Sequence, residues 1–313
     1  MKNKNLKRLK GDASQRIFFR NKKNKVPSIL IYAKKDKQFN LLIYDAINKI
    51  LLKNKIIAPK LLNENYLKNY IEIEDFGNQT IFNLLQKNLV NKLQTFKKII
   101  KLLIKIQSIQ QRKITNFKKK EYKIPIYTRK ILFNEAKLFS DWYVAQKLSK
   151  SKQLIFKKRY DKIVNSLITK LYLKNKIFVH RDFHVSNLMK VKNEIGVIDS
   201  QDALIGNRAY DLASLIDDVR FKTSNSTKKK LFNFYINSQK KLNKINFKND
   251  FEIISVLRNL KIIGIFTRLA VREKKKKYLK LIPYAWSLIE LRSKNNYKFK
   301  DLIDLLSIIK NRY

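Results

Sequence analysis

Residues 180–187 (HRDFHVSN) combine side-chain types that could carry out phosphoryl transfer. Asp182 is followed five positions later by Asn187, and a second aspartate, Asp199, comes twelve positions after that. This spacing is typical of kinase-like phosphotransferases, in which a catalytic loop and a metal site align an acceptor hydroxyl with the γ-phosphate of ATP. The pattern therefore predicts an ATP-dependent kinase.

The three polar residues suit different parts of that reaction. Because phosphoryl transfer passes through a loose transition state, the protein mainly positions groups and neutralises spreading negative charge. We predict that Asp182 is the catalytic base, which accepts or orients the hydroxyl proton. Asn187 and Asp199 are the predicted magnesium ligands, since Mg²⁺ on the phosphates of ATP requires hard oxygen ligands. A surface salt bridge is the alternative for the His-Arg-Asp triplet, and the asparagine and second aspartate argue against it.

Three further residues are predicted to support the loop. The two histidines of the chain, His180 and His184, both lie in it. We expect His184 to hold the loop by hydrogen bonds rather than to transfer protons. Asp211 opens a later helical stretch, where an acid fixes the catalytic-loop backbone in kinase-like folds. A helix N-cap is the alternative role for this residue.

Short apolar runs are expected to position these residues. The runs 176–179 and 188–191 are predicted to be strands that enter and leave the loop, and 195–198 is a third strand that ends at Asp199. Each acid then follows a strand end, where loops carry function on a rigid base.

Residues 1–77 are predicted to form a small, strand-rich N-lobe, with strands at 17–20 and 28–32 and one helix at 39–53. A turn before the first of these strands would lay backbone N–H groups over the phosphates of ATP, although a plain β-turn is the alternative. Its residues are Gly11, Asp12, Ala13 and Ser14, with Arg16 as the cation unless its side chain lies on the outer face of the strand. After a strand at 70–73, the predicted adenine-binding hinge consists of Glu74, Asp75 and Phe76.

Residues 78–313 are predicted to form a mainly helical C-lobe, which makes the expected fold α+β, bilobal and protein-kinase-like. Three stripes with helical spacing are expected to pack its core. They are Leu89, Leu93, Phe96, Ile100, Leu103 and Gln107, then 156–173, then 232–242.

Composition limits the other classes of function. The chain has 313 residues, a net charge of +47 and no cysteine, which excludes disulfides and thiolate chemistry. The lysines are spread along the whole chain, as codon bias in an AT-rich genome would produce, so we expect no specific nucleic-acid partner but a weak, salt-sensitive affinity for polyanions. No apolar run approaches the ~20 residues of a membrane helix, and the basic start leads into no apolar segment. We therefore expect a cytoplasmic protein that does not enter membranes.

The motifs resemble, nearly end to end, the aminoglycoside phosphotransferase (choline-kinase-like) superfamily. Within it, the chain is similar to the bacterial cell-wall amino-sugar kinases, which phosphorylate the anomeric hydroxyl of N-acetylmuramate and N-acetylglucosamine. The segments that carry the resemblance are 11–20, 73–77, 135–143, 180–189, 197–203, 210–215 and 260–269.

This resemblance implies ATP and Mg²⁺ as cofactors and a small sugar as the partner, in peptidoglycan recycling. It places the sugar near Asp202 and near a helical insert that contains Asp141 and Trp142. An aromatic ring beside acids suits a sugar, whose apolar face stacks while its hydroxyls bond. For Trp142, packing against other helices is the alternative.

Two features depart from the usual kinase pattern. The strand at 28–32 contains no lysine, and the helix at 39–53 contains no glutamate to pair with one. The branch that the chain resembles lacks that lysine too, so Arg16, Lys34 or Lys35 must meet the phosphate charge together with the metal. Ser200 follows the metal aspartate where the branch commonly has an aromatic residue, which puts regulation or stability in doubt more than chemistry.

Two kinds of alternative function remain at this point. A kinase with the same chemistry could act on an aminoglycoside, choline or another small alcohol, but a polycationic aminoglycoside calls for an acidic pocket, and the chain has 24 acidic against 71 basic residues. A catalytically inactive kinase fold or a polyanion-binding protein is the alternative from another class, and the complete set of three polar residues argues against it.

Overall fold

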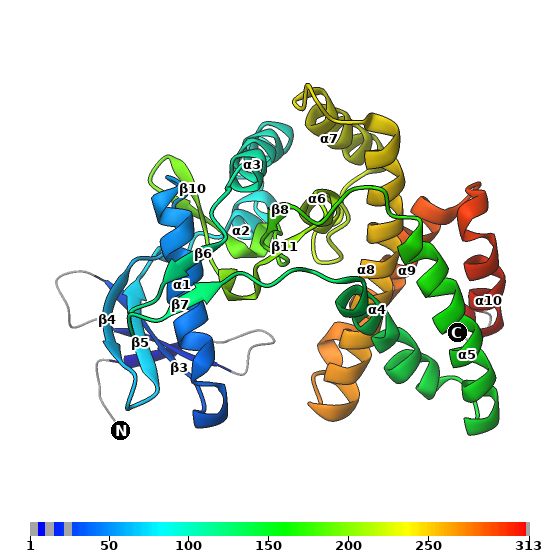
Figure 1. Ribbon diagram of the computed structural model, residues 1–313, viewed down its shortest axis with the longest axis horizontal. Helices are drawn as coiled ribbons and strands as arrows, with labels where there is room; N and C mark the ends of the chain where they lie inside the picture. Colours follow the sequence, from blue (N-terminus) through cyan, green and yellow to red (C-terminus); the bar gives the residue numbers. More distant parts are fainter. Residues whose placement is uncertain (1–5, 10–15, 22–26, 311–313) are drawn as a thin grey trace. The chain divides into compact units, whose positions relative to one another are not determined.

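The computed structural model describes residues 6–9, 16–21 and 27–310. The chain forms two compact units (Figure 1). Unit one consists of residues 1–125 and 177–205, and unit two of residues 126–176 and 206–313. The division into an N-lobe that ends at residue 77 and a C-lobe remains a prediction, since the compact units divide elsewhere.

Unit one is built on a five-stranded sheet with the order β1-β2-β3-β5-β4. Every neighbouring pair in it is antiparallel. The strands are β1 (Leu6–Leu9), β2 (Ile17–Asn21), β3 (Ser28–Tyr32), β4 (Leu61–Asn65) and β5 (Tyr70–Glu74). The predicted runs at 17–20, 28–32 and 70–73 therefore all lie in this sheet.

Helix α1 (Phe39–Lys53) covers one face of the sheet (Figure 1). Its Leu41 and Tyr44 belong to a buried cluster with Ile31 of β3 and Ile71 and Ile73 of β5. Burial of alternate residues on the strands and of one stripe on the helix is what holds such a layer together. The bounds predicted for this helix are those observed.

A second part of unit one carries the catalytic-loop segment. Strand β8 (Ile177–Val179) pairs with β11 (Leu204–Gly206), and β9 (Leu188–Val191) pairs with β10 (Glu194–Val197) as an antiparallel hairpin. Two backbone hydrogen bonds fix this hairpin to earlier parts of the chain, from Lys190 N to Gln79 O (2.8 Å) and from Val197 N to Ile57 O (2.8 Å). The remaining elements of the unit are α2 (Ile81–Gln86), α3 (Lys92–Gln107), β6 (Lys113–Thr115) and β7 (Glu121–Lys123).

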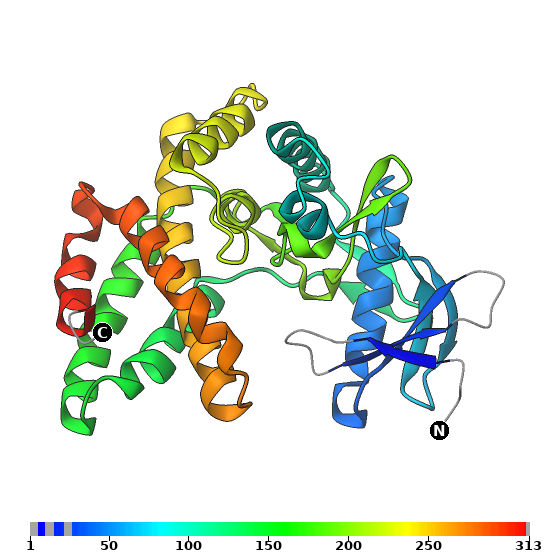
Figure 2. The ribbon, with the colours of Figure 1, turned by 180° about the vertical axis from the view of Figure 1, so that it is seen from behind.

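Unit two is helical, and most of its helices pack on the long helix α8 (Figure 2). Its elements are α4 (Arg129–Leu138), a π-helix (Phe139–Tyr143), α5 (Lys150–Thr169), α6 (Ala209–Ile216), α7 (Asn225–Asn237), α8 (Lys244–Arg272), α9 (Ile282–Ser293) and α10 (Lys300–Lys310). Short 3₁₀ turns connect several of them. No helix in the described ranges is long and apolar enough to cross a membrane.

The predicted apolar stripes extend beyond the bounds of the observed helices. Leu89 lies between α2 and α3 and is 65% exposed, because Asn91 caps the next helix by accepting the Gln94 N–H. The stripe predicted at 156–173 belongs to α5, which ends at Thr169, and the one at 232–242 belongs to α7, which ends at Asn237. Periodicity locates a buried face better than it locates the end of a helix.

Gly264 allows α8 to touch the π-helix directly. A Cβ atom at this position would lie 2.3 Å from the carbonyl carbon and oxygen of Leu138 and 2.6 Å from the nitrogen of Phe139. Because these are backbone atoms, no rotamer change could relieve the contact, and the two helices would have to separate.

A buried ion cluster joins four helices of unit two, from the end of α6 to α7, α8 and α9. Asp217 is fully buried and receives two hydrogen bonds from Arg292, at 2.8 and 2.9 Å. Lys228 Nζ lies 3.2 Å from the same carboxylate, and Ser255 Oγ donates to it at 2.6 Å. Burial alone would raise the pKa of Asp217, but the charges of Arg292 and Lys228 and these hydrogen bonds lower it.

We expect Gly264→Ala to lower the free energy of unfolding by about 3 kcal/mol, because the methyl group meets backbone atoms. Urea denaturation followed by circular dichroism measures it. Gly196→Ala is the matched control: its Cβ would meet the end of the Phe76 ring at 2.8 Å, and a side chain can move, so a loss of about 1 kcal/mol is expected. Equal losses for the two variants would contradict this interpretation.

Asp217 predicts a specific pH dependence of stability. Its folded-state pKa lies below the ordinary value of 3.8, so its contribution is fully present above that pH and is lost as the pH falls through the folded-state pKa. Asp217→Asn should lower the free energy of unfolding by about 3 kcal/mol at pH 7 and should also flatten the acid limb of the stability profile. Urea titrations between pH 3 and pH 7 measure both effects, and acid limbs of equal slope would contradict the role of Asp217.

Candidate active site

The catalytic-loop segment is held by short-range hydrogen bonds between β8 and β9. Asp182 accepts two of them at its carbonyl oxygen, from the His184 N–H (3.1 Å) and from Asn187 Nδ2 (3.1 Å). The Asn187 N–H donates to the carbonyl oxygen of His184 at 2.9 Å. Arg181 has a φ of 78°, a left-handed conformation that a non-glycine residue adopts at a cost and that commonly marks a functional loop. The loop therefore fixes its own backbone and leaves the Asp182 carboxylate half-buried.

The second acidic segment is tied to this loop. His180 is fully buried, and its Nε2 lies 3.1 Å from the carbonyl oxygen of Ile198, the residue before Asp199. The Ile198 N–H donates to the carbonyl oxygen of Asn187 at 3.1 Å. These contacts fit the loop-supporting role predicted for His180. His184 is also buried, with its Nε2 3.5 Å from Asn187 Nδ2.

Arg16, at the start of β2, forms an ion pair with Asp199. Its Nη2 lies 2.9 Å from Asp199 Oδ1, and its side chain is 10% exposed. The guanidinium carbon is 5.7 Å from the ring centre of Phe18 and 5.9 Å from that of Tyr44 on α1, which is cation–π distance for both. Arg16 therefore points inward from the sheet, and the alternative of the outer strand face is wrong.

The acids of unit one influence one another. Burial raises the pKa of Asp199, the charge of Arg16 lowers it, and the nearby carboxylates of Asp182 and Asp202 raise it again, so the net shift is upward. Burial, and then the charge of Asp199, raise the pKa of Tyr44 well above its usual range. Tyr44 therefore stays neutral beneath Arg16, and the cluster of carboxylates is ready to receive positive charge.

The donor atoms of Asn187 and Asp199 fit a magnesium ion. Asn187 Nδ2 is used within the loop, while its Oδ1 accepts no hydrogen bond from the described residues and the side chain is half-buried. The Asp199 side chain is 34% exposed, with a φ of 63° that turns the chain sharply after β10. The described ranges contain no group of three His, Asp or Glu side chains that could hold a metal alone. This donor set suits Mg²⁺, which keeps water and phosphate oxygens in its coordination shell.

The hinge segment presents one open backbone position. The Glu74 N–H donates to Lys60 O at 2.9 Å, and the Asp75 N–H donates to Pro27 O at 3.2 Å. The Asp75 carboxylate binds Arg20 and accepts the Gly77 N–H at 2.7 Å. Neither the N–H nor the C=O of Phe76 has a partner among the described residues. Of the three predicted hinge residues, Phe76 is therefore the one whose backbone is available to an adenine ring.

The residues predicted to bind the sugar lie in different surroundings. In unit one, Asp202 is exposed on a 3₁₀ turn (Ser200–Asp202), and burial together with its charge raises the pKa of Tyr122 to about 12. In unit two, Asp141 and Trp142 are half-buried on the π-helix, where Asp141 lies 2.9 Å from Lys157 Nζ. Tyr143, next along the chain, is a packing residue that stacks on Phe139.

Two other groups of residues were predicted to take part: the loop-supporting Asp211 and the residues that would meet the phosphates. Asp211 is fully buried as the third residue of α6, while Asn207 Oδ1 accepts the Ala209 N–H at 2.9 Å, so the alternative of an N-cap at Asp211 is wrong. Gly11, Asp12, Ala13 and Ser14 lie outside the described residues. Lys34 and Lys35, the other two candidates for the missing cation, are exposed.

Sequence reasoning missed the part that α1 plays beside Asp199. Tyr44 lies beneath Arg16, and Asn48, one turn later, accepts a 2.6 Å hydrogen bond from Ser200 Oγ. The apolar period of the helix was visible, but a tyrosine and an asparagine within it resembled ordinary helix positions. The signal that could have identified them is the missing lysine–glutamate pair, which requires another link between helix and metal site.

The chain is similar to known phosphotransferases over most of its length. A family model described as "Phosphotransferase enzyme family" matches residues 5–241. The N-acetylmuramate/N-acetylglucosamine kinase of Neisseria meningitidis serogroup B is 29% identical over 283 residues, which cover 87% of this chain and 80% of the relative. The protein of the same name from Pseudomonas aeruginosa is 27% identical over 259 residues, which cover 80% of this chain and 72% of the relative.

Solved structures share the fold at low sequence identity. A choline/ethanolamine kinase family protein from Mesorhizobium loti aligns with a TM-score of 0.62 and 11% identity, covering 96% of this chain and 92% of that one. The ADP-bound aminoglycoside phosphotransferase APH(2'')-Ib aligns with a TM-score of 0.60 and 15% identity, covering 91% and 94%. These similarities confirm the predicted α+β, kinase-like fold class.

We expect Arg16→Ala to raise the KM for ATP by about 10-fold or more, because it removes the buried cation beside Asp199. Arg16→Lys should recover part of the loss, since it keeps the charge without the planar fork. Initial rates at fixed free Mg²⁺ and varied ATP measure the effect. The control is Arg8→Ala, which removes an exposed arginine from the neighbouring strand β1. An unchanged KM in Arg16→Ala would show that this cation is structural only.

Proposed function

Because the chain belongs to the phosphotransferase enzyme family and is therefore a kinase, we propose that it transfers the γ-phosphoryl group of ATP to the anomeric hydroxyl of an amino sugar. The proposed acceptors are N-acetylmuramate and N-acetylglucosamine. The observation that carries the proposal is the similarity, over at least 80% of this chain, to the kinases of Neisseria and Pseudomonas named for these two sugars. The likeness to aminoglycoside and choline kinases is one of fold at 11–15% identity and does not favour their acceptors.

In the proposed reaction, Asp182 is the base for the acceptor hydroxyl. Its half-buried carboxylate accepts a hydrogen bond from the sugar hydroxyl and takes the proton as the oxygen bonds to the γ-phosphorus. The bond from the γ-phosphorus to the oxygen that bridges to the β-phosphate breaks, and ADP leaves. The hydrogen bonds from His184 and Asn187 to the Asp182 carbonyl oxygen hold the loop during this step.

Asn187 Oδ1 and Asp199 would hold Mg²⁺, which neutralises the charge on the phosphates and orients them. Arg16 adds a cation from the sheet at the same place, since its guanidinium already lies against Asp199. Phe76 offers its backbone to the adenine ring. Arg16 is therefore the residue that we propose in place of the missing small-lobe lysine.

For the acceptor we propose binding beside Asp202, with Asp141 and Trp142 as further sugar-binding residues. Asp202 is exposed and not paired with a cation among the described residues. Its Oδ2 accepts a hydrogen bond from Gln201 Nε2 at 2.9 Å, which leaves Oδ1 available to a sugar hydroxyl. The net charge of +47 favours an acidic sugar such as N-acetylmuramate over a polycation. Such a substrate would come from peptidoglycan recycling in the cytoplasm.

ATP consumption with Mg²⁺ should be measured against N-acetylmuramate, N-acetylglucosamine, choline and kanamycin, with ³¹P NMR of each product. We expect turnover with the two amino sugars and the signal of a sugar 1-phosphate. A product phosphorylated at another hydroxyl would overturn the anomeric position. Turnover restricted to choline or kanamycin would overturn the sugar class while leaving the kinase in place.

We expect Asp182→Ala to reduce kcat by about 10²- to 10⁴-fold, because the hydroxyl loses the group that orients it and takes its proton. The far-UV circular dichroism spectrum and the thermal midpoint should stay close to those of the wild type. Asp36→Ala, which removes an exposed aspartate, is the control and should retain full activity. Full activity in Asp182→Ala would remove this residue from the role of base.

A further inference from the structure

Ser200, the residue after the metal aspartate, is hydrogen-bonded to helix α1. Its Oγ donates to Asn48 Oδ1 at 2.6 Å, and the two residues are separated by 152 positions in the sequence. Ser200 is fully buried and Asn48 is 3% exposed. A short hydrogen bond between neutral groups away from water is costly to break, because each partner would be left unsatisfied.

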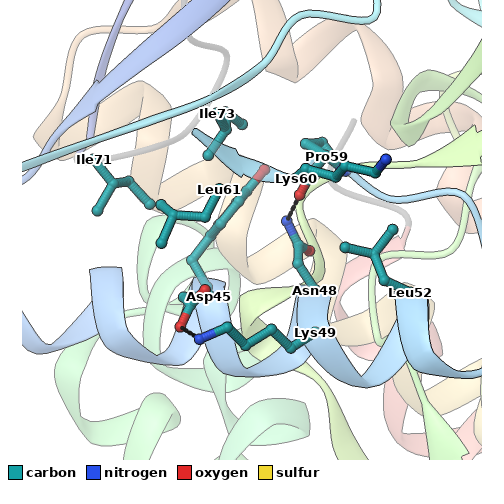
Figure 3. Close-up of a pocket in the computed structure, with 10 residues that line it drawn as sticks. Asp45, Asn48, Lys49, Leu52, Pro59, Lys60, Leu61, Ile71 and Ile73 are labelled. Carbon is teal, nitrogen blue, oxygen red and sulfur yellow. Dashed lines mark hydrogen bonds and ion pairs between the residues drawn. The ribbon is translucent and has the colours of Figure 1, made fainter. Parts of the chain in front are cut away.

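Asn48 is fixed in turn by a second contact. Its Nδ2 donates to the carbonyl oxygen of Pro59 at 3.0 Å, just before β4, as Figure 3 shows. Tyr44, which lies beneath Arg16, precedes Asn48 by one turn of the same helix. One buried amide therefore joins the helix, the start of a sheet strand and the segment that carries Asp199.

Apolar packing is interrupted at this point of α1. A cavity of about 200 Å³ lies between the helix and the sheet, bordered by Asn48 and Leu52 of α1 and by Leu61, Ile71 and Ile73 of the strands (Figure 3). Because side chains do not fill this side, hydrogen bonds contribute more to the position of Asn48 than they would in a close-packed core.

The backbone at Asp199 needs such support. Asp199 has a left-handed φ of 63°, and its carboxylate is paired with Arg16 at 2.9 Å. A non-glycine residue holds that conformation only where its neighbours determine it. Ser200 lies directly after it, begins the 3₁₀ turn and is the side chain that reaches α1.

We propose that Asn48 and Ser200 form a positioning pair that sets Asp199 for metal binding and makes its placement depend on helix α1. This neutral pair does the work of the lysine–glutamate ion pair that β3 and α1 lack. The inference rests on the proposed function of Asp199 as a ligand of the metal that accompanies ATP. It also gives the serine after this aspartate a role, since its short hydroxyl side chain reaches Asn48 from a fully buried position.

The test is a double-mutant cycle with Ser200→Ala, Asn48→Ala and the combined variant. The affinity for ADP is measured by calorimetry across a series of Mg²⁺ concentrations. Each single variant should need about 10-fold more Mg²⁺ for half-maximal ADP binding, as is typical when a residue that orients a metal ligand is lost. The combined variant should need no more Mg²⁺ than Asn48→Ala alone, about 10-fold and not ~100-fold, because both substitutions delete the same bond between Ser200 and Asn48.

Controls separate positioning from stability. Ser293→Ala removes a buried hydroxyl that bonds only within its own helix α9, and it should leave the Mg²⁺ dependence unchanged. Ser200→Ala removes a single oxygen and carries the test alone if Asn48→Ala does not fold. A lower thermal midpoint with unchanged Mg²⁺ dependence would overturn the proposal, and so would multiplying effects in the combined variant. Wild-type protein that binds Mg·ADP but phosphorylates neither amino sugar would overturn the proposed acceptor and leave the result for the pair standing.

Discussion

The candidate site in unit one depends on how the charge of Asp199 is compensated. Burial raises the pKa of Asp199, and the charges of Asp182 and Asp202 raise it further. Charges in such a place must be compensated by nearby cations or by the ligand itself. The inward-pointing Arg16 compensates part of this charge in the protein alone, and Mg²⁺ with its nucleotide would compensate the rest. The site is therefore built to be completed by a cation, which is what a phosphate-transferring enzyme needs.

The positive charge beside Asp199 comes from a different residue than in the usual kinase design. There, a lysine of the sheet and a glutamate of the helix form an ion pair. Here, Arg16, just before β2, pairs with Asp199 directly, and the helix is joined by the neutral Asn48–Ser200 bond. Tyr44 lies next to both parts of this arrangement, because it is beneath Arg16 and one helical turn before Asn48. Separating the charge from the structural link means that the cation can move toward phosphate without releasing the helix.

Local sequence patterns predicted much of this structure, but they predicted almost none of its long-range contacts. The bounds of α1 and the strands around the catalytic loop followed from the apolar period, because this is a property of neighbouring residues. The roles of Asp182, Asn187 and Asp199 stay predictions from their spacing. The partner of Arg16 and the role of Ser200 did not follow, since both depend on segments more than 150 positions apart. The ion cluster around Asp217 was missed for the same reason, and Leu89 was misplaced because a cap can end an apolar stripe without breaking its period.

The contact between Gly264 and the π-helix limits which residues and which turn geometry can occur there. A π-helix contains one residue more than the α-helix that it interrupts, and here the widened turn rests on a helix that has no side chain at the point of contact. Neither feature is stable without the other: a normal turn would leave a gap over the glycine, and a larger residue would push the wide turn away. The widened turn and the glycine therefore constrain each other, and a change in one is expected to require a change in the other.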